Sequence, residues 1–129
     1  MRTSRYEEQI ISVLKKEKID FIREKNYTDL RKGKYRFDFY FPKNNCLVEI
    51  QGEQHYVYVA RFYKRRSDFL SARERDRRKI SYALANNIKL FIIPYWELPK
   101  ITSGADLFQQ KYLATNRWKN DDDWREYNR

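Results

Sequence analysis

The sequence predicts a single α/β domain in which helices flank a mixed central sheet. Residues 35–51 hold two segments of alternating polar and apolar residues on either side of a turn-like segment, Pro42-Lys43-Asn44-Asn45, which is the pattern of an antiparallel hairpin. Segments before and after this hairpin space their apolar residues three and four apart, as amphipathic helices do. The nearly all-apolar segment 89–94 is typical of a strand buried on both faces.

The first helix is predicted to start at Ser4 and to end near Lys18. Ser4 and Glu7 have the spacing of a capping box. The apolar stripe that follows contains Tyr6, Ile10, Val13 and Leu14. Glu7 lies at the edge of this stripe, so its carboxylate either closes the cap or points inward toward the sheet.

The hairpin carries the main indication of function. A short strand over residues 19–24 should precede it, and aromatic residues should line one side of its first strand: Tyr35, Phe37, Phe39 and Phe41. Asp38 stands on the other side of that strand. Glu49 stands on the next strand, with Gln51 on the same side. Two carboxylates on neighbouring strands suit a hard, oxygen-seeking cation such as Mg²⁺.

A second helix is predicted from a capping box at Ser71 and Glu74 to about Asn86. Asp76 falls on its apolar face, where an acid is expected to pair with a basic neighbour, here Arg73 or Lys79 at a spacing of three residues. Residues 102–113 are predicted to form a last helix. Residues 1–117 would then make up the domain, and residues 118–129 a polar tail.

The net charge of +10 over 129 residues favours a polyanionic partner. Residues 61–79 hold nine basic and three acidic side chains, so we expect phosphate contacts from Arg61, Lys64, Arg65, Arg66, Arg73 and Lys79. No apolar segment approaches the roughly 20 residues that a membrane span needs, and no signal peptide is recognisable. The single cysteine, Cys46, is predicted to be a small core residue, which fits a cytoplasmic protein.

This order of elements, with Asp38 on the second strand and Glu49-Ile50-Gln51 on the third, resembles the PD-(D/E)XK nuclease superfamily. The first helix resembles the first helix of that superfamily. The segment RERDRRKISYALANNIKLFIIPYW (residues 73–96) resembles the helix and strand after the core in very-short-patch-repair-like members. EIQGEQHY (residues 49–56) is similar to a motif of phage and mobile-element nucleases, including homing endonucleases.

The resemblance implies a restriction-endonuclease-like three-layer core and metal-dependent hydrolysis of double-stranded DNA. Asp38, Glu49 and the Ile50 carbonyl would hold Mg²⁺, for which Mn²⁺ can substitute. Glu7 would act from the first helix, and His55 would contact phosphate or a water molecule unless its role is structural. A homodimer would explain double-strand cutting.

Gln51 departs from the motif, because the usual residue at its position is lysine. Glutamine can orient an attacking water molecule but cannot deprotonate it. Gln51 is therefore the reason to consider a DNA-binding protein with a decayed nuclease site. Two further alternatives are a structure-selective junction resolvase, which can use the same core, and a basic RNA-binding module. No aromatic signature of an RNA-recognition motif is present.

Overall fold

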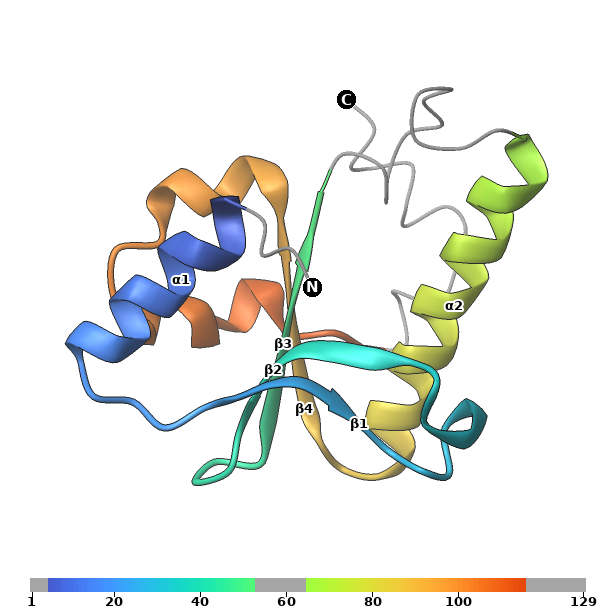
Figure 1. Cartoon of the computed structure of the whole chain (residues 1–129), viewed down its shortest axis with the longest axis horizontal. Coiled ribbons are helices and arrows are strands. Elements are labelled where there is room, and N and C mark those ends of the chain that lie inside the picture. The colour runs from blue at the N-terminus through green and yellow to red at the C-terminus, as the bar shows by residue number, and fades with distance from the viewer. Residues whose placement is uncertain (1–4, 53–64, 116–129) are drawn as a thin grey trace.

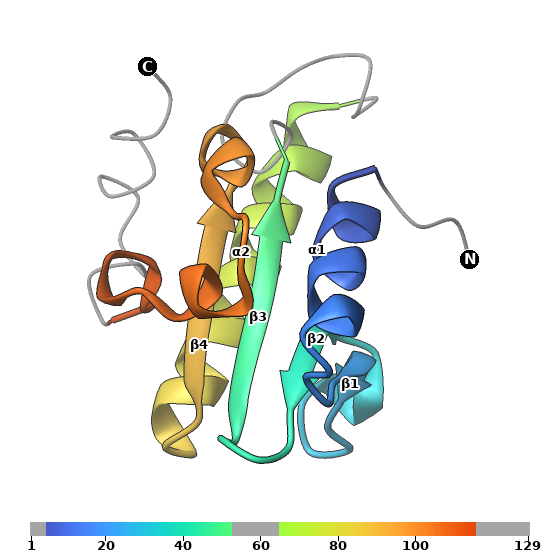
Figure 2. The same ribbon diagram turned by 90° about the vertical axis from the view of Figure 1, so that its left-hand side faces the viewer.

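The computed structural model describes residues 5–52 and 65–115, which form three layers (Figure 1). A four-stranded sheet in the order β1-β2-β3-β4 lies in the middle. Helix α1 (Arg5–Lys16) and the short C-terminal helices cover one face of the sheet, while helix α2 (Arg66–Ala85) covers the other (Figures 1 and 2). The predicted α/β class with helices on both faces is confirmed.

The sheet is mixed, as predicted. Strands β1 (Ile22–Asn26), β2 (Arg36–Phe41) and β3 (Cys46–Gln51) pair antiparallel, and β4 (Lys89–Pro94) runs parallel to β3. The predicted hairpin is therefore present. At its turn Asn45 adopts a φ of 50°, a left-handed conformation that asparagine tolerates better than most residues.

A hydrophobic core lies on each side of the sheet. The core under α1 contains buried side chains from α1 and from strands β2, β3 and β4, including Ile10, Leu14, Phe39, Phe41, Val48, Phe91 and Ile93. The core under α2 includes Phe37, Leu47, Ile80, Ala83, Leu90 and Ile92. Because neighbouring residues of β4 alternate between the two cores, this strand is buried on both faces, as its apolar sequence predicted.

The alternation of β2 breaks at Asp38. Phe39 and Phe41 pack in the core under α1, whereas Phe37 packs in the core under α2. The prediction that these aromatic residues share one side of the strand is therefore wrong for Phe37, and also for Tyr35, which precedes β2 and packs against the core under α2. Glu24 of β1 lies between the residues that pair with Phe37 and Phe39, and its φ of 54° marks a distortion of the sheet at the same point.

Two predicted element boundaries differ from the structure. The first strand begins at Ile22, three residues later than predicted, because Ile19 packs against the core under α1 after a left-handed residue, Lys18. Helix α2 begins at Arg66, so Ser71 lies inside it and the predicted capping box is wrong. Ser4, the predicted cap of α1, lies outside the described residues.

The predicted last helix is replaced by two short 3-10 helices, Gly104–Phe108 and Gln110–Tyr112. Gln109, with a ψ of 143°, is extended and interrupts the helical path between them. The first of these helices is capped, since the Asp106 carboxylate accepts a hydrogen bond of 3.0 Å from the Ser103 amide. Within residues 5–52 and 65–115, no helix combines the length and apolarity that crossing a membrane requires.

Gly104 permits the C-terminal segment to pack closely against the end of α1. A Cβ atom at this position would lie 2.3 Å from Cδ1 of Ile19. We predict that Gly104→Ala lowers the free energy of unfolding by about 1–3 kcal/mol, because side chains must move to make room. Chemical denaturation measures this change. Ala105→Ser, at the exposed neighbouring residue, is the control, and an equally small effect of both substitutions would contradict the prediction.

Candidate active site

Asp38 and Glu49 meet at the seam between β2 and β3. The last regular pair of this seam is Phe39 with Val48, which places Asp38 opposite Glu49. The Asp38 amide donates to Oε1 of Glu49 at 2.9 Å, and the Ile50 amide donates to Oδ2 of Asp38 at 2.7 Å. Carboxylate oxygens thus take the acceptor role that backbone carbonyls play elsewhere in a sheet. Each of the two predicted acids therefore accepts a hydrogen bond from a backbone amide on the other acid's strand.

Lys79 of α2 is the third member of this cluster. Its Nζ lies 3.0 Å from Oε2 of Glu49 and donates a 2.5 Å hydrogen bond to the carbonyl oxygen of Arg36. The same nitrogen lies 4.8 Å from the centre of the Phe37 ring. Lys79 is only 7% exposed. The structure therefore places it inside the molecule, beside the predicted metal ligand, and not on the outer surface where we expected a phosphate contact.

The electrostatics of the cluster keep Lys79 charged. Burial by itself lowers the pKa of Lys79, but the carboxylates of Glu49, Asp76 and Asp38 outweigh burial, so the pKa is raised. Asp76 is buried as well, as its place on the apolar face of α2 predicted. Lys79 is consequently an ammonium ion at neutral pH, surrounded by acids from the sheet and from its own helix.

The surroundings of Asp38 disfavour ionisation of its carboxyl group. Burial and the neighbouring charge of Glu49 raise the pKa of Asp38 well above its usual value, against the lowering effects of the Ile50 amide and Lys79. Glu7 of α1 raises it further. Glu7 also forms an ion pair with Arg23 of β1. Its carboxylate therefore turns toward the sheet, in agreement with the inward-pointing interpretation.

Gln51 lies two residues beyond Glu49 on the same side of β3. It is 1% exposed, and its Oε1 has no hydrogen-bond partner among the described residues. A buried acceptor without a donor is costly, so such an atom often marks the place of a water molecule or ligand. An Oε1 atom that accepts no hydrogen bond from the described residues fits the predicted role of Gln51 in orienting a water molecule.

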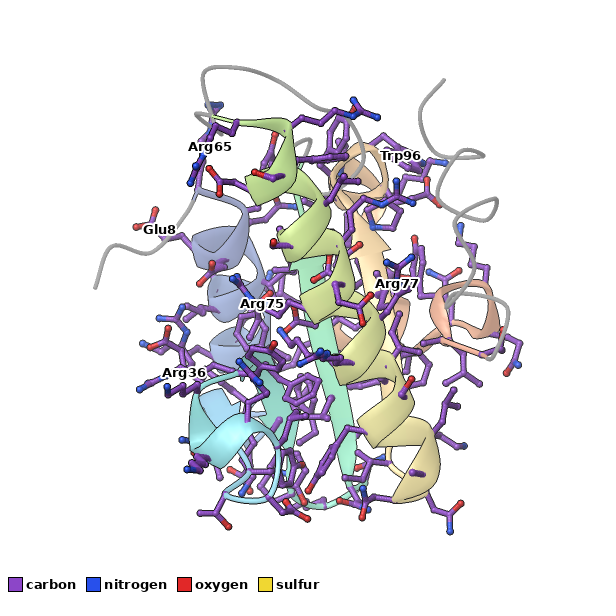
Figure 3. All side chains as sticks on the ribbon, turned by 90° about the vertical axis from the view of Figure 1, so that its right-hand side faces the viewer. Glu8, Arg36, Arg65, Arg75, Arg77 and Trp96 are labelled. Atoms are coloured by element: carbon purple, nitrogen blue, oxygen red, sulfur yellow. The ribbon has the colours of Figure 1, made fainter. Side chains whose placement is uncertain are left out.

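The predicted phosphate contacts that the structure describes differ in their surroundings. Arg65 and Arg66 are exposed at the start of α2 (Figure 3 labels Arg65). Arg73 is half-buried, with its guanidinium 5.8 Å from the centre of the Phe69 ring. His55, Arg61 and Lys64 lie outside the described residues.

The donor chemistry of the cluster fits a magnesium ion. Mg²⁺ is commonly held by one or two carboxylates while it keeps several water ligands, and Asp38 and Glu49 supply two. A cation beside Asp38 would relieve the repulsion that raises its pKa. Within the part of the chain that the structure describes, no group of three or more His, Cys, Asp or Glu side chains is close enough to hold a metal ion.

Comparisons with known proteins assign no family. No protein-family model matches the chain, and no solved structure matches it. A segment of 58 residues, 45% of the chain, is 36% identical to "Uncharacterized protein 307L" of Invertebrate iridescent virus 6. The match spans only 29% of that viral protein.

The raised pKa of Asp38 predicts a pH-dependent cost to stability. A carboxyl group whose pKa is higher in the folded state binds protons more tightly there, so stability falls as the pH rises above the usual value of 3.8. Without metal, Asp38→Asn should therefore raise the melting temperature at pH 7, and the gain should shrink toward pH 4. Melting curves from pH 4 to pH 8 in EDTA measure this.

The control for this experiment is Asp20→Asn, which removes a carboxylate whose side chain is 70% exposed. It should leave the melting temperature nearly unchanged at every pH. If Asp38→Asn behaves in the same way, the Asp38 carboxylate is not held against the charge of Glu49.

Proposed function

We propose that this protein is a metal-dependent DNA endonuclease with a restriction-endonuclease-like core. The element order α1-β1-β2-β3-α2-β4 and the positions of Asp38 on β2 and Glu49 on β3 agree with the PD-(D/E)XK resemblance. The observation that carries the proposal is the cluster of half-buried Asp38 with buried Glu49 and Lys79 at the distorted centre of the sheet. It combines two acids and one ammonium group, the charged groups of the PD-(D/E)XK motif.

Asp38 and Glu49, with the Ile50 carbonyl, would hold Mg²⁺ or Mn²⁺. When bound, the ion would neutralise charge on the scissile phosphate and favour ionisation of the attacking water. Glu7 would contribute a further negative charge from α1. Asp38 would bind the ion in its ionised form, so metal binding should weaken as the pH falls through its raised pKa.

Lys79 would take the role of the lysine that the PD-(D/E)XK motif usually has at the position of Gln51. Because its pKa is raised, it would act as a cation and hydrogen-bond donor and not as a general base. Its ammonium group, beside Glu49, would stabilise negative charge that develops on the phosphate. The buried Oε1 of Gln51 would accept a hydrogen bond from the attacking water and orient it.

One observation favours a second candidate, a DNA-binding protein with a decayed nuclease site. Both oxygens of Glu49 already have partners, Oε1 with the Asp38 amide and Oε2 with Lys79. A cation that binds Glu49 must compete with this ion pair. If the competition fails, the cluster serves only to hold the sheet and α2 together.

Two measurements distinguish these candidates. In a plasmid-nicking assay we expect cleavage with Mg²⁺ or Mn²⁺, none with EDTA, and none with Asp38→Asn. In thermal melting we expect Mn²⁺ to stabilise the wild-type chain and not Asp38→Asn, since only the wild type supplies both carboxylates. A chain that binds DNA but shows neither effect is the decayed form.

Substitution of Lys79 separates its role in the active site from a role in DNA binding. We predict that Lys79→Gln slows single-turnover cleavage at saturating protein by about 10²–10³-fold, the usual loss for one group that stabilises transition-state charge. Its dissociation constant for DNA should change little, because Lys79 is buried. Lys16→Gln removes the same charge from the exposed end of α1 and is the control. A weaker dissociation constant with unchanged cleavage would make Lys79 a phosphate contact instead.

Moving the lysine to the motif position provides a rescue test. If Lys79 replaces the motif lysine, the double variant Lys79→Gln/Gln51→Lys should recover part of the activity that Lys79→Gln loses. Breaking a buried ion pair costs about 3–5 kcal/mol, so circular dichroism must show that both variants are folded. Folded variants that remain equally inactive would refute the equivalence of the two positions.

A further inference from the structure

A groove on the outer side of α2 is lined by three arginine residues. It is open to solvent, has a volume of about 580 Å³ and lies between α2 and the loop that joins β1 to β2. Arg31 comes from the loop, while Arg77 and Arg78 come from the helix. Leu30, Ser81 and Tyr82 complete an apolar and hydroxyl-bearing floor, and Glu74 is the acidic residue in the lining.

The arginine side chains around this groove are held in place by neighbouring groups. The guanidinium groups of Arg31 and Arg75 each lie 5.8 Å from the centre of the Tyr35 ring. Glu74 lies 2.8 Å from the guanidinium of Arg77 and 3.5 Å from that of Arg78. Figure 3 shows Arg75 on the edge of α2 nearer Arg36, and Arg77 on the opposite edge. Groups fixed in this way lose less conformational freedom when they bind a ligand.

The loop itself has an unusual backbone. Arg31, Lys32 and Gly33 have φ values of 48°, 54° and 78°, so three consecutive residues are left-handed. This conformation costs free energy for residues other than glycine and persists where the surroundings enforce it. Tyr82 of α2 anchors the loop, since its hydroxyl donates a 2.6 Å hydrogen bond to Asp29. The strained loop therefore projects Arg31 and Lys32, both exposed, beside the arginine residues of α2.

We propose that this groove binds the phosphodiester backbone of duplex DNA outside the cleavage site, with Arg31 and Arg78 as phosphate contacts. The proposal rests on the proposed nuclease function for its choice of DNA. Guanidinium groups match phosphate oxygens in pairs, and the groove and its borders carry more basic than acidic side chains. Lys79 points from the opposite face of the same helix to the acidic cluster, so α2 lies between the groove and that cluster.

This surface differs from the one that the sequence indicated. Arg31 lies some thirty residues before the basic segment 61–79 and joins it only through the fold. Of the basic residues in that segment, Arg77 and Arg78 line the groove, although neither was predicted as a contact. The N-terminal residues of α2 would extend the contact along the helix.

The test compares two double variants that remove the same charge. One is Arg31→Ala/Arg78→Ala in the groove, and the other is Lys15→Ala/Lys16→Ala on exposed positions of α1 in the opposite layer. Fluorescence anisotropy with a labelled DNA duplex in EDTA gives the dissociation constant at several salt concentrations. The slope of log K against log salt changes by about 0.9 for each phosphate contact.

We expect the groove variant to bind at least 10-fold more weakly at low salt and to lose about two contacts from the slope. The α1 variant should keep the wild-type slope. Equal losses in both variants would show that only net charge matters and would overturn the proposal, as would stronger competition by duplex RNA than by duplex DNA. Arg31→Lys/Arg78→Lys, which keeps the charge without the paired donors, should bind with intermediate affinity.

Cleavage is not measured in this experiment, so its outcome is independent of the nuclease activity. A chain that loses DNA binding with the groove variant but never cuts DNA would support the groove and refute the nuclease. If the wild-type chain cuts DNA and the groove variant binds DNA with normal affinity, the nuclease function is supported and the groove is refuted.

Discussion

The exchange of hydrogen bonds between Asp38 and Glu49 is the constraint on which the rest of the site depends. Each carboxylate accepts a backbone amide from the other's strand, so the acids are part of the sheet itself. This arrangement coincides with the point where β2 changes the side on which its aromatic residues pack. It also leaves two like charges close together in a partly dry environment. Lys79 of α2 compensates this negative charge through its ion pair with Glu49, which also links the helix to the sheet.

The same centre links stability to function. Asp38 is less stable as an anion here than in water, because burial and Glu49 both oppose its ionisation. A site that stores this repulsion gains more from a divalent cation than a site whose charges are already balanced. The ion pair of Lys79 with Glu49 acts in the other direction, since it satisfies one acid before any metal arrives. Under the proposed nuclease function, cleavage of DNA would depend on the balance between these two interactions.

Sequence patterns predicted the elements whose periodicity follows from burial. The hairpin, the buried strand β4 and the inward position of Asp76 all follow from the alternation or helical spacing of apolar residues. Local patterns failed where tertiary contacts decide the outcome. The capping box at Ser71 is present in the sequence, yet α2 starts at Arg66 and runs through it. Phe37 packs in the other core because the strand is distorted at Asp38, and a rule of strict alternation cannot predict such a distortion.

The role of Lys79 was also hidden from the sequence for a physical reason. It lies in a basic segment, where charge alone suggests a solvent-facing phosphate contact. Its spacing from Asp76, three residues along α2, made it a candidate partner of that buried acid, but its ion pair with Glu49 of β3 depends on how α2 packs on the sheet. Arg31 gave no such signal, since only the fold brings its loop to the arginine residues of α2.

A crystal grown with Mn²⁺ and a DNA duplex would test the central claim most directly, through the anomalous scattering of the metal. We predict a manganese ion coordinated by Asp38 and Glu49, with Lys79 shifted from Glu49 toward the phosphate. Anomalous density elsewhere, or none, with the ion pair of Lys79 and Glu49 intact beside bound DNA, would contradict it. In that case the cluster is a structural element of a DNA-binding protein.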